Sequence, residues 1–178
     1  MKLFIALLFF SLTSTAVSFA KTQDFTVEKD HFKVEVPDTW IVPKYSLGAP
    51  VALVSKMGKS DRRSVVQIVP YGIKDDENKL KKFEKDPEDY VEQKENWLES
   101  VRAESLSYDD YAEEKINGNT LYSIGVTYHG LDGVFHERQY YISTASHKIF
   151  YVKTLIPDDL EKTDNQVSEK IVRSIASI

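Results

Sequence analysis

Alternation of apolar and polar residues predicts a chain rich in β-strands. Phe32, Val34 and Val36 alternate with charged residues, which is the period of a half-buried strand. Asn117-Gly118 is a strong signal for a two-residue hairpin turn. The predicted strand segments are Asp24–Glu28, His31–Val36, Val51–Ser55, Ser64–Tyr71, Ser107–Ile116, Thr120–Tyr128, Val134–Thr144 and Ile149–Ile156. The last four follow one another with short turns, so we expect an antiparallel meander.

Two helices are predicted among these strands, at about Asp86–Glu104 and Asp164–Ala176. Asp86 and Pro87 are typical residues for a helix start. The apolar face of the first helix is expected to comprise Tyr90, Val91, Trp97, Leu98 and Val101. For the second, Thr163 and Gln166 fit a capping box, and the inner face is expected to comprise Val167, Ile171, Val172 and Ile175. The polar segment Lys74–Lys85 is either a short solvated helix or a loop.

The first 20 residues read as a cleaved signal peptide. Lys2 is followed by an apolar run from Leu3 to Leu12, and Ser18 and Ala20 provide the small residues that a signal peptidase requires. We therefore place the cleavage site after Ala20. A retained membrane anchor is the alternative, but this run is short and contains several hydroxyl residues, whereas a spanning helix needs about 20 mostly apolar residues. The expected location is periplasmic or secreted, with no transmembrane segment after cleavage.

The elements predict a single domain over residues 21–178. Val51–Ser55 and Ile149–Ile156 are apolar on both sides, which indicates that both faces of the sheet are covered. We therefore expect the α+β class, with a single mainly antiparallel sheet and helices packed on its faces as an α/β/α sandwich. A chain of this length buries enough surface to fold without disulfides, and it contains no cysteine.

The segment FKVEVPDTW at Phe32–Trp40 resembles the opening of the PsbP/Mog1-like group, and KIVRSI at Lys170–Ile175 is similar to the end of its last helix. The group consists of α/β/α sandwiches and includes periplasmic proteins of the DcrB type. The resemblance implies that fold and a non-catalytic role in binding or assembly. It provides no catalytic residues to transfer to this chain.

Composition excludes several classes of function. The net charge of −5 disfavours nucleic-acid binding, which needs a basic surface. The glycines form neither a dinucleotide-binding nor a P-loop motif, and no G-x-S-x-G sequence marks a hydrolase serine. The absence of cysteine removes thiol chemistry and most structural zinc sites. We expect no cofactor.

Histidine is the remaining candidate for catalysis or metal binding. The four histidines are His31, His129, His136 and His147. His129 and His136 bracket one predicted hairpin, and Glu137 follows. Consecutive strand residues point to opposite faces, however, so His136 and Glu137 are not expected to share a metal ion. Ser123, His129 and Asp132 have the residue types of a catalytic triad, but a triad is defined by geometry. Solvated histidines at strand ends are the favoured interpretation.

Aromatic residues are abundant in the predicted sheet, and we expect most of them to contribute to packing. The strand tyrosines are Tyr108, Tyr111, Tyr122, Tyr128, Tyr140, Tyr141 and Tyr151. A ligand-stacking platform is the alternative, but tyrosine is also a good strand former. Trp40 and Trp97 are both predicted to lie in the core.

Two surfaces are candidates for binding. One is the lysine-rich part of Lys74–Lys85, and the other is the loop Pro43–Pro50, since loops on a rigid sheet often bind partners. The candidate residues are Tyr45, Leu47, Lys79, Lys81, Lys82 and Lys85. The sequence thus predicts a non-catalytic, exported module that binds an unknown protein or envelope component, with no nucleic-acid partner. An envelope enzyme using His129 or His136, or a carrier of a small apolar ligand, are the alternatives.

Overall fold

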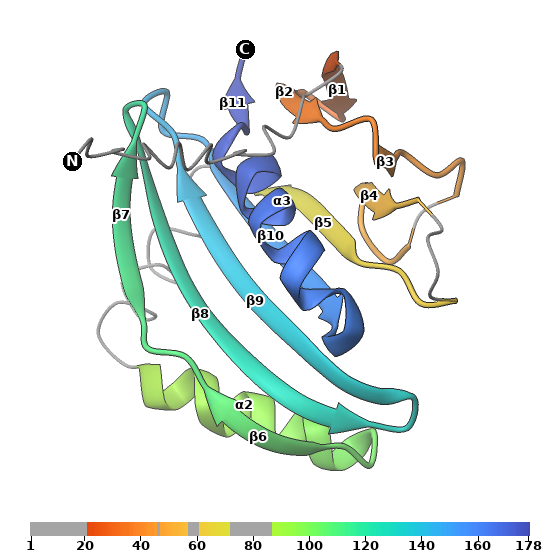
Figure 1. Cartoon of the computed structure of the whole chain (residues 1–178). Coiled ribbons are helices and arrows are strands. Elements are labelled where there is room, and N and C mark those ends of the chain that lie inside the picture. Colours follow the sequence, from red (N-terminus) through yellow and green to blue (C-terminus); the bar gives the residue numbers. More distant parts are fainter. Residues whose placement is uncertain (1–20, 46, 57–60, 72–86) are drawn as a thin grey trace, which may run out of the picture.

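Two antiparallel sheets form most of the described chain, which in this computed structural model covers residues 21–45, 47–56, 61–71 and 87–178 (Figure 1). The larger sheet has eight strands, in the spatial order β3-β4-β5-β10-β9-β8-β6, and β7 also pairs with β8. These strands are β3 (Trp40–Ile41), β4 (Val51–Ser55), β5 (Val65–Tyr71), β6 (Glu104–Tyr108), β7 (Ala112–Ile116), β8 (Asn119–Gly130), β9 (Gly133–Ser143) and β10 (Ile149–Pro157). The smaller sheet has the order β1-β2-β11 and comprises β1 (Lys21–Val27), β2 (Asp30–Val36) and β11 (Ala176–Ser177).

The long hairpin of β8 and β9 forms the centre of the larger sheet. Its pairing runs from Gly130 opposite Gly133 at the turn to Thr120 opposite Ser143 at the far end. The predicted meander is confirmed, although its first strand is divided into β6 and β7, which both pair with β8. Side chains alternate across a strand, so the even-numbered residues of β9 face one side of the sheet and the odd-numbered residues face the other.

The main core lies on the face that carries helix α3 (Glu161–Arg173), which follows a single 3₁₀ turn, η1 (Asp158–Leu160). The inner side of α3 and the inner side of β2 both pack against β5, β9 and β10 in one cluster. Phe32 of β2 meets Phe150 of β10 edge to face, with ring centroids 5.1 Å apart. Trp40 is 3% exposed within this cluster, which confirms its predicted place in the core.

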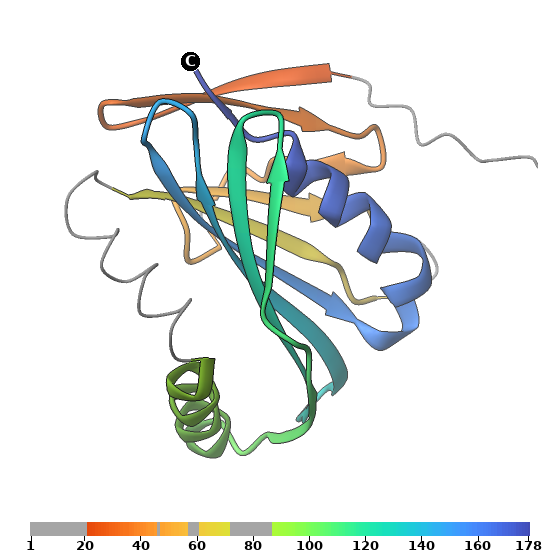
Figure 2. The same cartoon turned by 90° about the vertical axis from the view of Figure 1, so that its left-hand side faces the viewer.

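Helix α2 (Pro87–Ser100) packs on the opposite face of the larger sheet, so the sheet lies between the two helices (Figure 2). The contact is small. Leu98 is buried against Val126 and Tyr128 of β8, and partly buried residues of β6, β9 and β10 complete this second cluster. Helix α2 lies toward one end of this face (Figure 1).

Three expectations about the fold were wrong in detail. A second sheet is present, because β2 buries its apolar face against the main core and pairs with β11 instead of joining the larger sheet. Ala176 belongs to β11 and not to the last helix. Thr163 is not a capping residue, since α3 begins at Glu161 and the Thr163 hydroxyl donates to the Leu160 carbonyl 3.0 Å away. Because the η1 turn continues directly into α3, the helix begins earlier in the sequence than the predicted Asp164.

Candidate functional site

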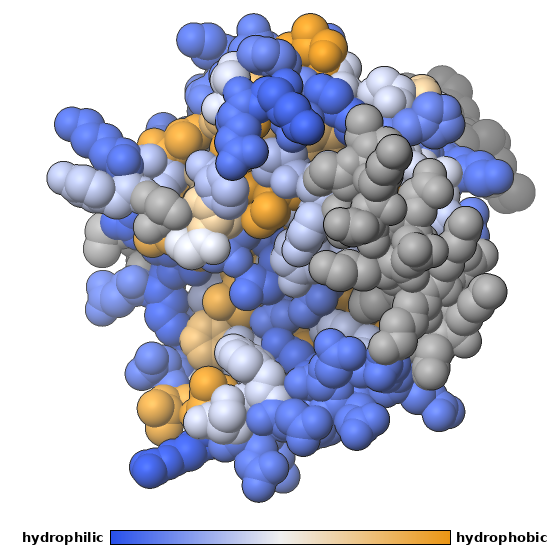
Figure 3. All heavy atoms as spheres, turned by 180° about the vertical axis from the view of Figure 1, so that it is seen from behind, coloured by the Kyte–Doolittle hydropathy of each residue, from blue (hydrophilic) through white to orange (hydrophobic). Residues whose placement is uncertain are grey.

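A pocket of about 280 Å³ lies between α2 and the larger sheet. We call it the α2 pocket, and it is lined by Tyr90, Gln93, Lys94, Trp97, Glu137, Gln139 and Lys153. The first four residues come from α2 and the others from β9 and β10. Figure 3 shows this side of the molecule, on which hydrophilic residues dominate and apolar ones lie scattered between them.

An ion pair between Lys94 and Glu137 forms one side of the α2 pocket. The Lys94 Nζ lies 2.8 Å from Glu137 Oε1, and the exposed fractions of the two side chains are 7% and 3%. Lys94 stands one turn from Tyr90 and one turn from Leu98, so it occupies the middle of the buried helix face. Glu137 is an odd-numbered residue of β9 and therefore points toward α2. The backbone positions thus bring both charges to the same buried point.

Aromatic rings surround the Lys94 ammonium. Its Nζ lies 3.8 Å from the centroid of the Trp97 ring and 5.4 Å from that of Tyr128. These are distances at which a cation is attracted to the face of a ring. Trp97 meets Tyr128 edge to face, with centroids 5.9 Å apart, yet Trp97 remains 42% exposed. The prediction that Trp97 belongs to the core was therefore wrong, because this residue covers an ion pair and not an apolar layer.

The electrostatics of the pocket follow from burial. Desolvation lowers the pKa of Lys94, and attraction to the Glu137 carboxylate opposes that effect. Burial raises the pKa of Tyr128 to about 12, and the charge of Glu137 adds to the rise. The Tyr128 phenol therefore remains neutral near neutral pH.

Lys153 brings a second cation to the α2 pocket. It lies opposite Gln139 in the β9–β10 register, on the α2 side of the sheet, and is partly buried. Lys153 forms no ion pair with any carboxylate of the described residues, whereas Gln139 donates from Nε2 to Glu137 Oε1 over 3.0 Å. Among the residues that line the pocket, two ammonium groups therefore face one carboxylate. The net charge of the α2 pocket lining is therefore positive, although the chain as a whole is negative.

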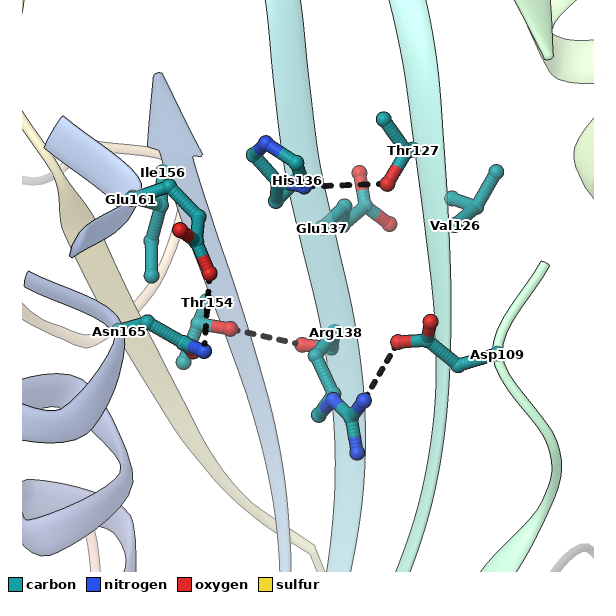
Figure 4. A pocket seen from close by; sticks show the side chains of 10 residues that line it. All are labelled: Asp109, Val126, Thr127, His136, Glu137, Arg138, Thr154, Ile156, Glu161 and Asn165. Atoms are coloured by element: carbon teal, nitrogen blue, oxygen red, sulfur yellow. Dashed lines mark hydrogen bonds and ion pairs between the residues drawn. The ribbon is translucent and has the colours of Figure 1, made fainter. Parts of the chain in front are cut away.

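A second, more polar pocket of about 170 Å³ lies on the α3 side of the sheet, and Figure 4 shows its lining. The residues are Asp109, Val126, Thr127, His136, Glu137, Arg138, Thr154, Ile156, Glu161 and Asn165. Arg138 and Asp109 point toward each other and form an ion pair. Both ring nitrogens of His136 are engaged, Nδ1 with the Thr127 hydroxyl and Nε2 with Asp158, each at 3.0 Å. Glu137 is paired with Lys94 on the other face of the sheet, and Asn165 donates to Glu161, so each charged group of this pocket already has a polar partner.

The histidine-based hypotheses find little support in this geometry. Ser123 and His129 lie six residues apart on β8, which is about 20 Å at the rise of a strand, so they do not form a triad. His136 and Glu137 face opposite sides of the sheet, as predicted. Among the described residues, no three groups of metal-ligating type lie close enough to hold an ion.

The predicted binding residues fall into two groups. Tyr45 and Leu47 are 82% and 43% exposed in the loop before β4, and they lie outside both pockets. Lys79, Lys81, Lys82 and Lys85 lie outside the described residues. No helix of the described chain is both long and apolar enough to cross a membrane.

A mostly antiparallel sheet between α2 on one face and α3 with a small sheet on the other defines this chain as a PsbP/Mog1-like fold. Cyanobacterial PsbP (CyanoP) from Synechocystis sp. PCC 6803 is similar over 92% of this chain and 96% of its own, at 15% identity and a TM-score of 0.51. LpqN, which is involved in cell envelope biogenesis of Mycobacterium tuberculosis, is similar over 87% and 91%, at 15% identity and a TM-score of 0.57.

A Mog1 variant is similar over 88% of this chain and 95% of that chain, but its TM-score of 0.45 at 9% identity is too low to add weight. No protein-family model and no curated protein matches the chain. At 15% identity the likeness to PsbP and LpqN shows the fold alone.

Proposed function

We propose that this chain is an exported, non-catalytic accessory protein of the cell envelope that binds a partner at the α2 pocket. Three features support the export and the class: the signal-like first 20 residues, the PsbP-like fold, and the involvement of the similarly folded LpqN in cell envelope biogenesis. The observation that carries the proposal is the buried Lys94–Glu137 pair at an open pocket.

A buried ion pair is weak evidence for a role in stability, because apolar residues of similar volume often stabilise a core equally well or better. Its presence in the sparse contact between α2 and the sheet therefore favours a role in recognition. The described residues that line the α2 pocket offer charges, amides and rings, and none of them is a serine, threonine or histidine. Such a set suits binding better than acyl transfer or hydrolysis, and it is too polar for a carrier of apolar ligands.

A pull-down from the native envelope tests this proposal. The tagged protein serves as bait, beside the pocket variants Lys153→Glu and Trp97→Ala and the control Lys33→Glu, which changes an exposed residue of β2. We expect wild type and control to retain the same partner and both pocket variants to lose it. Equal recovery by all four baits would refute binding at the α2 pocket. Circular dichroism and thermal melting verify that each variant is folded.

Export has its own test. We expect protein from the envelope fraction to begin at Lys21, since Ser18 and Ala20 provide the small residues before the cleavage site. Intact mass and N-terminal sequencing measure this directly. Recovery of Met1 in a membrane pellet would show a retained anchor instead.

Two further contact surfaces are proposed. One is the loop that contains the exposed Tyr45 and Leu47, and the other is the lysine-rich segment with Lys79, Lys81, Lys82 and Lys85. Reversal of the four lysines to glutamate should change thermal stability little, because exposed charges each contribute little. If these lysines attract an acidic partner, reversal weakens its capture, and added salt does the same to wild type. If capture is unchanged, the contact lies at Tyr45 and Leu47 or at the α2 pocket alone.

A further inference from the structure

We infer that the α2 pocket binds a carboxylate carried on a small apolar group, with Lys153 as its charged partner and Trp97 as its apolar contact surface. This inference rests on the proposed function and names the chemical class of the ligand. It follows from the charges, the donors, the walls and the size of the pocket.

The charged residues of the α2 pocket indicate that its ligand is negatively charged. Glu137 is already engaged by Lys94 at 2.8 Å and by Gln139 at 3.0 Å. Lys153 lies close enough to Lys94 to help lower the pKa of that residue, yet no described carboxylate pairs with it. A partly buried ammonium without a partner is costly, and a bound anion removes that cost. The pocket is therefore completed by one negative charge.

The hydrogen-bond donors and the aromatic surface of the α2 pocket restrict the chemical class of the ligand further. Gln93 lines the pocket and has an amide to donate, so a carboxylate beside Lys153 could be reached from α2 as well as from β10. Trp97 is 42% exposed and already packs edge to face on Tyr128, so its indole is held in place while a large part of it remains accessible. Aromatic and aliphatic groups both pack well on such a ring. A carboxylate joined to a ring or a short apolar chain matches both features.

The volume of the α2 pocket sets an upper limit on the size of its ligand. Small-molecule sites usually measure about 300–1,000 Å³, so a pocket of about 280 Å³ takes a single side chain or a fragment and not a lipid. Two sources carry the required chemistry: a free aromatic or aliphatic acid, and the C-terminal carboxylate of a peptide that ends in an aromatic residue. The two sources are distinguished by experiment.

The test is a titration followed by NMR on isotope-labelled protein purified after export. The probes are phenylacetate and its neutral analogue phenylacetamide, then a short peptide ending in phenylalanine with a free or an amidated C-terminus. We expect the carboxylate forms to shift the resonances of the Trp97 indole and the Gln139 amide. The neutral forms should bind about tenfold more weakly or worse, because they lose a charge-assisted hydrogen bond. Tighter binding of the free acid or of the peptide identifies the source.

Variants establish the role of Lys153. Lys153→Gln should lower the affinity for the carboxylate probes by about tenfold and leave the affinity for the amide probes unchanged. Lys153→Arg should retain most of the affinity for the carboxylate probes. Lys33→Gln is the matched control on an exposed strand and should bind as wild type does. Binding should also weaken as ionic strength rises from about 0.01 M to about 0.15 M.

Two results would overturn the inference: equal affinity for the acid and the amide, or unchanged affinity in Lys153→Gln. Neither would by itself refute the proposed function, which depends on whether pocket variants lose the partner in the pull-down. Conversely, carboxylate binding without loss of any partner in that experiment would support the ligand class and contradict the accessory role at this pocket. A thermal melt of Lys153→Gln excludes misfolding as the cause of lost binding.

Discussion

The Lys94 ammonium lies 2.8 Å from a carboxylate oxygen of Glu137, and both side chains are more than nine-tenths buried. The contact joins the middle of α2 to the middle of β9, and Trp97 lies over the ammonium. In so small a helix–sheet contact, the two charges hold α2 at a defined position on the sheet. Removing one of them leaves the other buried and uncompensated.

Removing one partner of the Lys94–Glu137 ion pair should therefore lower the stability of the fold substantially. We expect Lys94→Met to lower the free energy of unfolding by about 3–5 kcal/mol, because Glu137 would then be a buried charge without a counterion. Glu137→Leu should have a cost in the same range. The double variant should recover most of the loss, since an apolar pair of similar volume is often neutral or stabilising. Urea denaturation at neutral pH measures all three values.

Arg173→Gln is the control for this experiment. Arg173 pairs with Glu114 at 2.6 Å, but the side chains are 39% and 46% exposed. Its loss should cost no more than about 1 kcal/mol. If Lys94→Met costs as little as Arg173→Gln, the Lys94–Glu137 pair is not a buried interaction in solution.

The two tryptophans should differ sharply in their contribution to stability. Trp40 is 3% exposed in the main core, and Trp40→Ala should cost about 3–5 kcal/mol. Trp97→Ala should cost about 1–2 kcal/mol, the usual range for one cation–π contact and one aromatic pair together. Fluorescence quenching provides a second measurement: Trp97→Phe leaves Trp40 as the one tryptophan, and acrylamide should then quench the emission far less than in wild type. Equal costs for the two alanine variants would contradict the assigned burial.

The elements of this fold were largely predictable because each one has a local signal. The Asn117-Gly118 turn and the alternation in Phe32–Val36 specified strands and a hairpin that the structure confirms. The second sheet was not predictable, because an apolar strand face is satisfied equally by pairing within one sheet or by packing across a core. Only long-range contacts, such as the Ser174 hydroxyl accepting from the Glu35 amide at 2.9 Å, decide between the two.

The α2 pocket was missed for a different reason. Lys94 falls four residues after Tyr90 and four before Leu98, a charged position in the middle of an apolar helix face. Glu137 likewise falls on the same side of its strand as the partly buried Phe135. Each break in the pattern was a signal that a charge would be buried. Which two charges would meet depends on how α2 lies on the sheet, and no local pattern contains that relationship.

Alkaline pH should destabilise the fold. Burial raises the pKa of five tyrosines above their ordinary value of 10.0, namely Tyr90, Tyr108, Tyr128, Tyr140 and Tyr151. For Tyr128 the pKa is about 12. The unfolded chain releases these protons near pH 10 while the folded chain retains them, so the unfolded state binds fewer protons. The free energy of unfolding must then fall as pH rises above 10.

Lys94 acts in the opposite direction at lower pH, because burial lowers its pKa and the folded state releases its proton first. Its effect is complete once the unfolded chain titrates at the ordinary value of 10.5. Five phenols outweigh one ammonium, so the net slope should be negative. Tyrosinate absorbance and circular dichroism, followed together, provide the measurement. A group of tyrosines should ionise only as the secondary structure is lost. Ionisation of all ten tyrosines near pH 10 with the fold intact would contradict the burial of these residues.

Gly125 should be required for the position of Asp109. The Asp109 amide donates to the Gly125 carbonyl at 3.0 Å, and the Asp109 carboxylate passes over Gly125 to reach Arg138. A Cβ at position 125 would overlap that carboxylate and lie 3.2 Å from the Glu137 carbonyl oxygen. We expect Gly125→Ala to cost about 1–3 kcal/mol, the usual range for overpacking. Urea denaturation provides the measurement.

A double-mutant cycle separates this clash from a general preference for glycine. Asp109→Ala alone should cost no more than about 1 kcal/mol, because the Asp109–Arg138 pair is 47% and 32% exposed. With Asp109 truncated, the main obstacle to a Cβ is gone, so Gly125→Ala should cost clearly less in the Asp109→Ala background than in wild type. Equal costs in both backgrounds would place the strain at the Glu137 carbonyl. Gly125 would then act on the β8–β9 backbone rather than on the ion pair beside it.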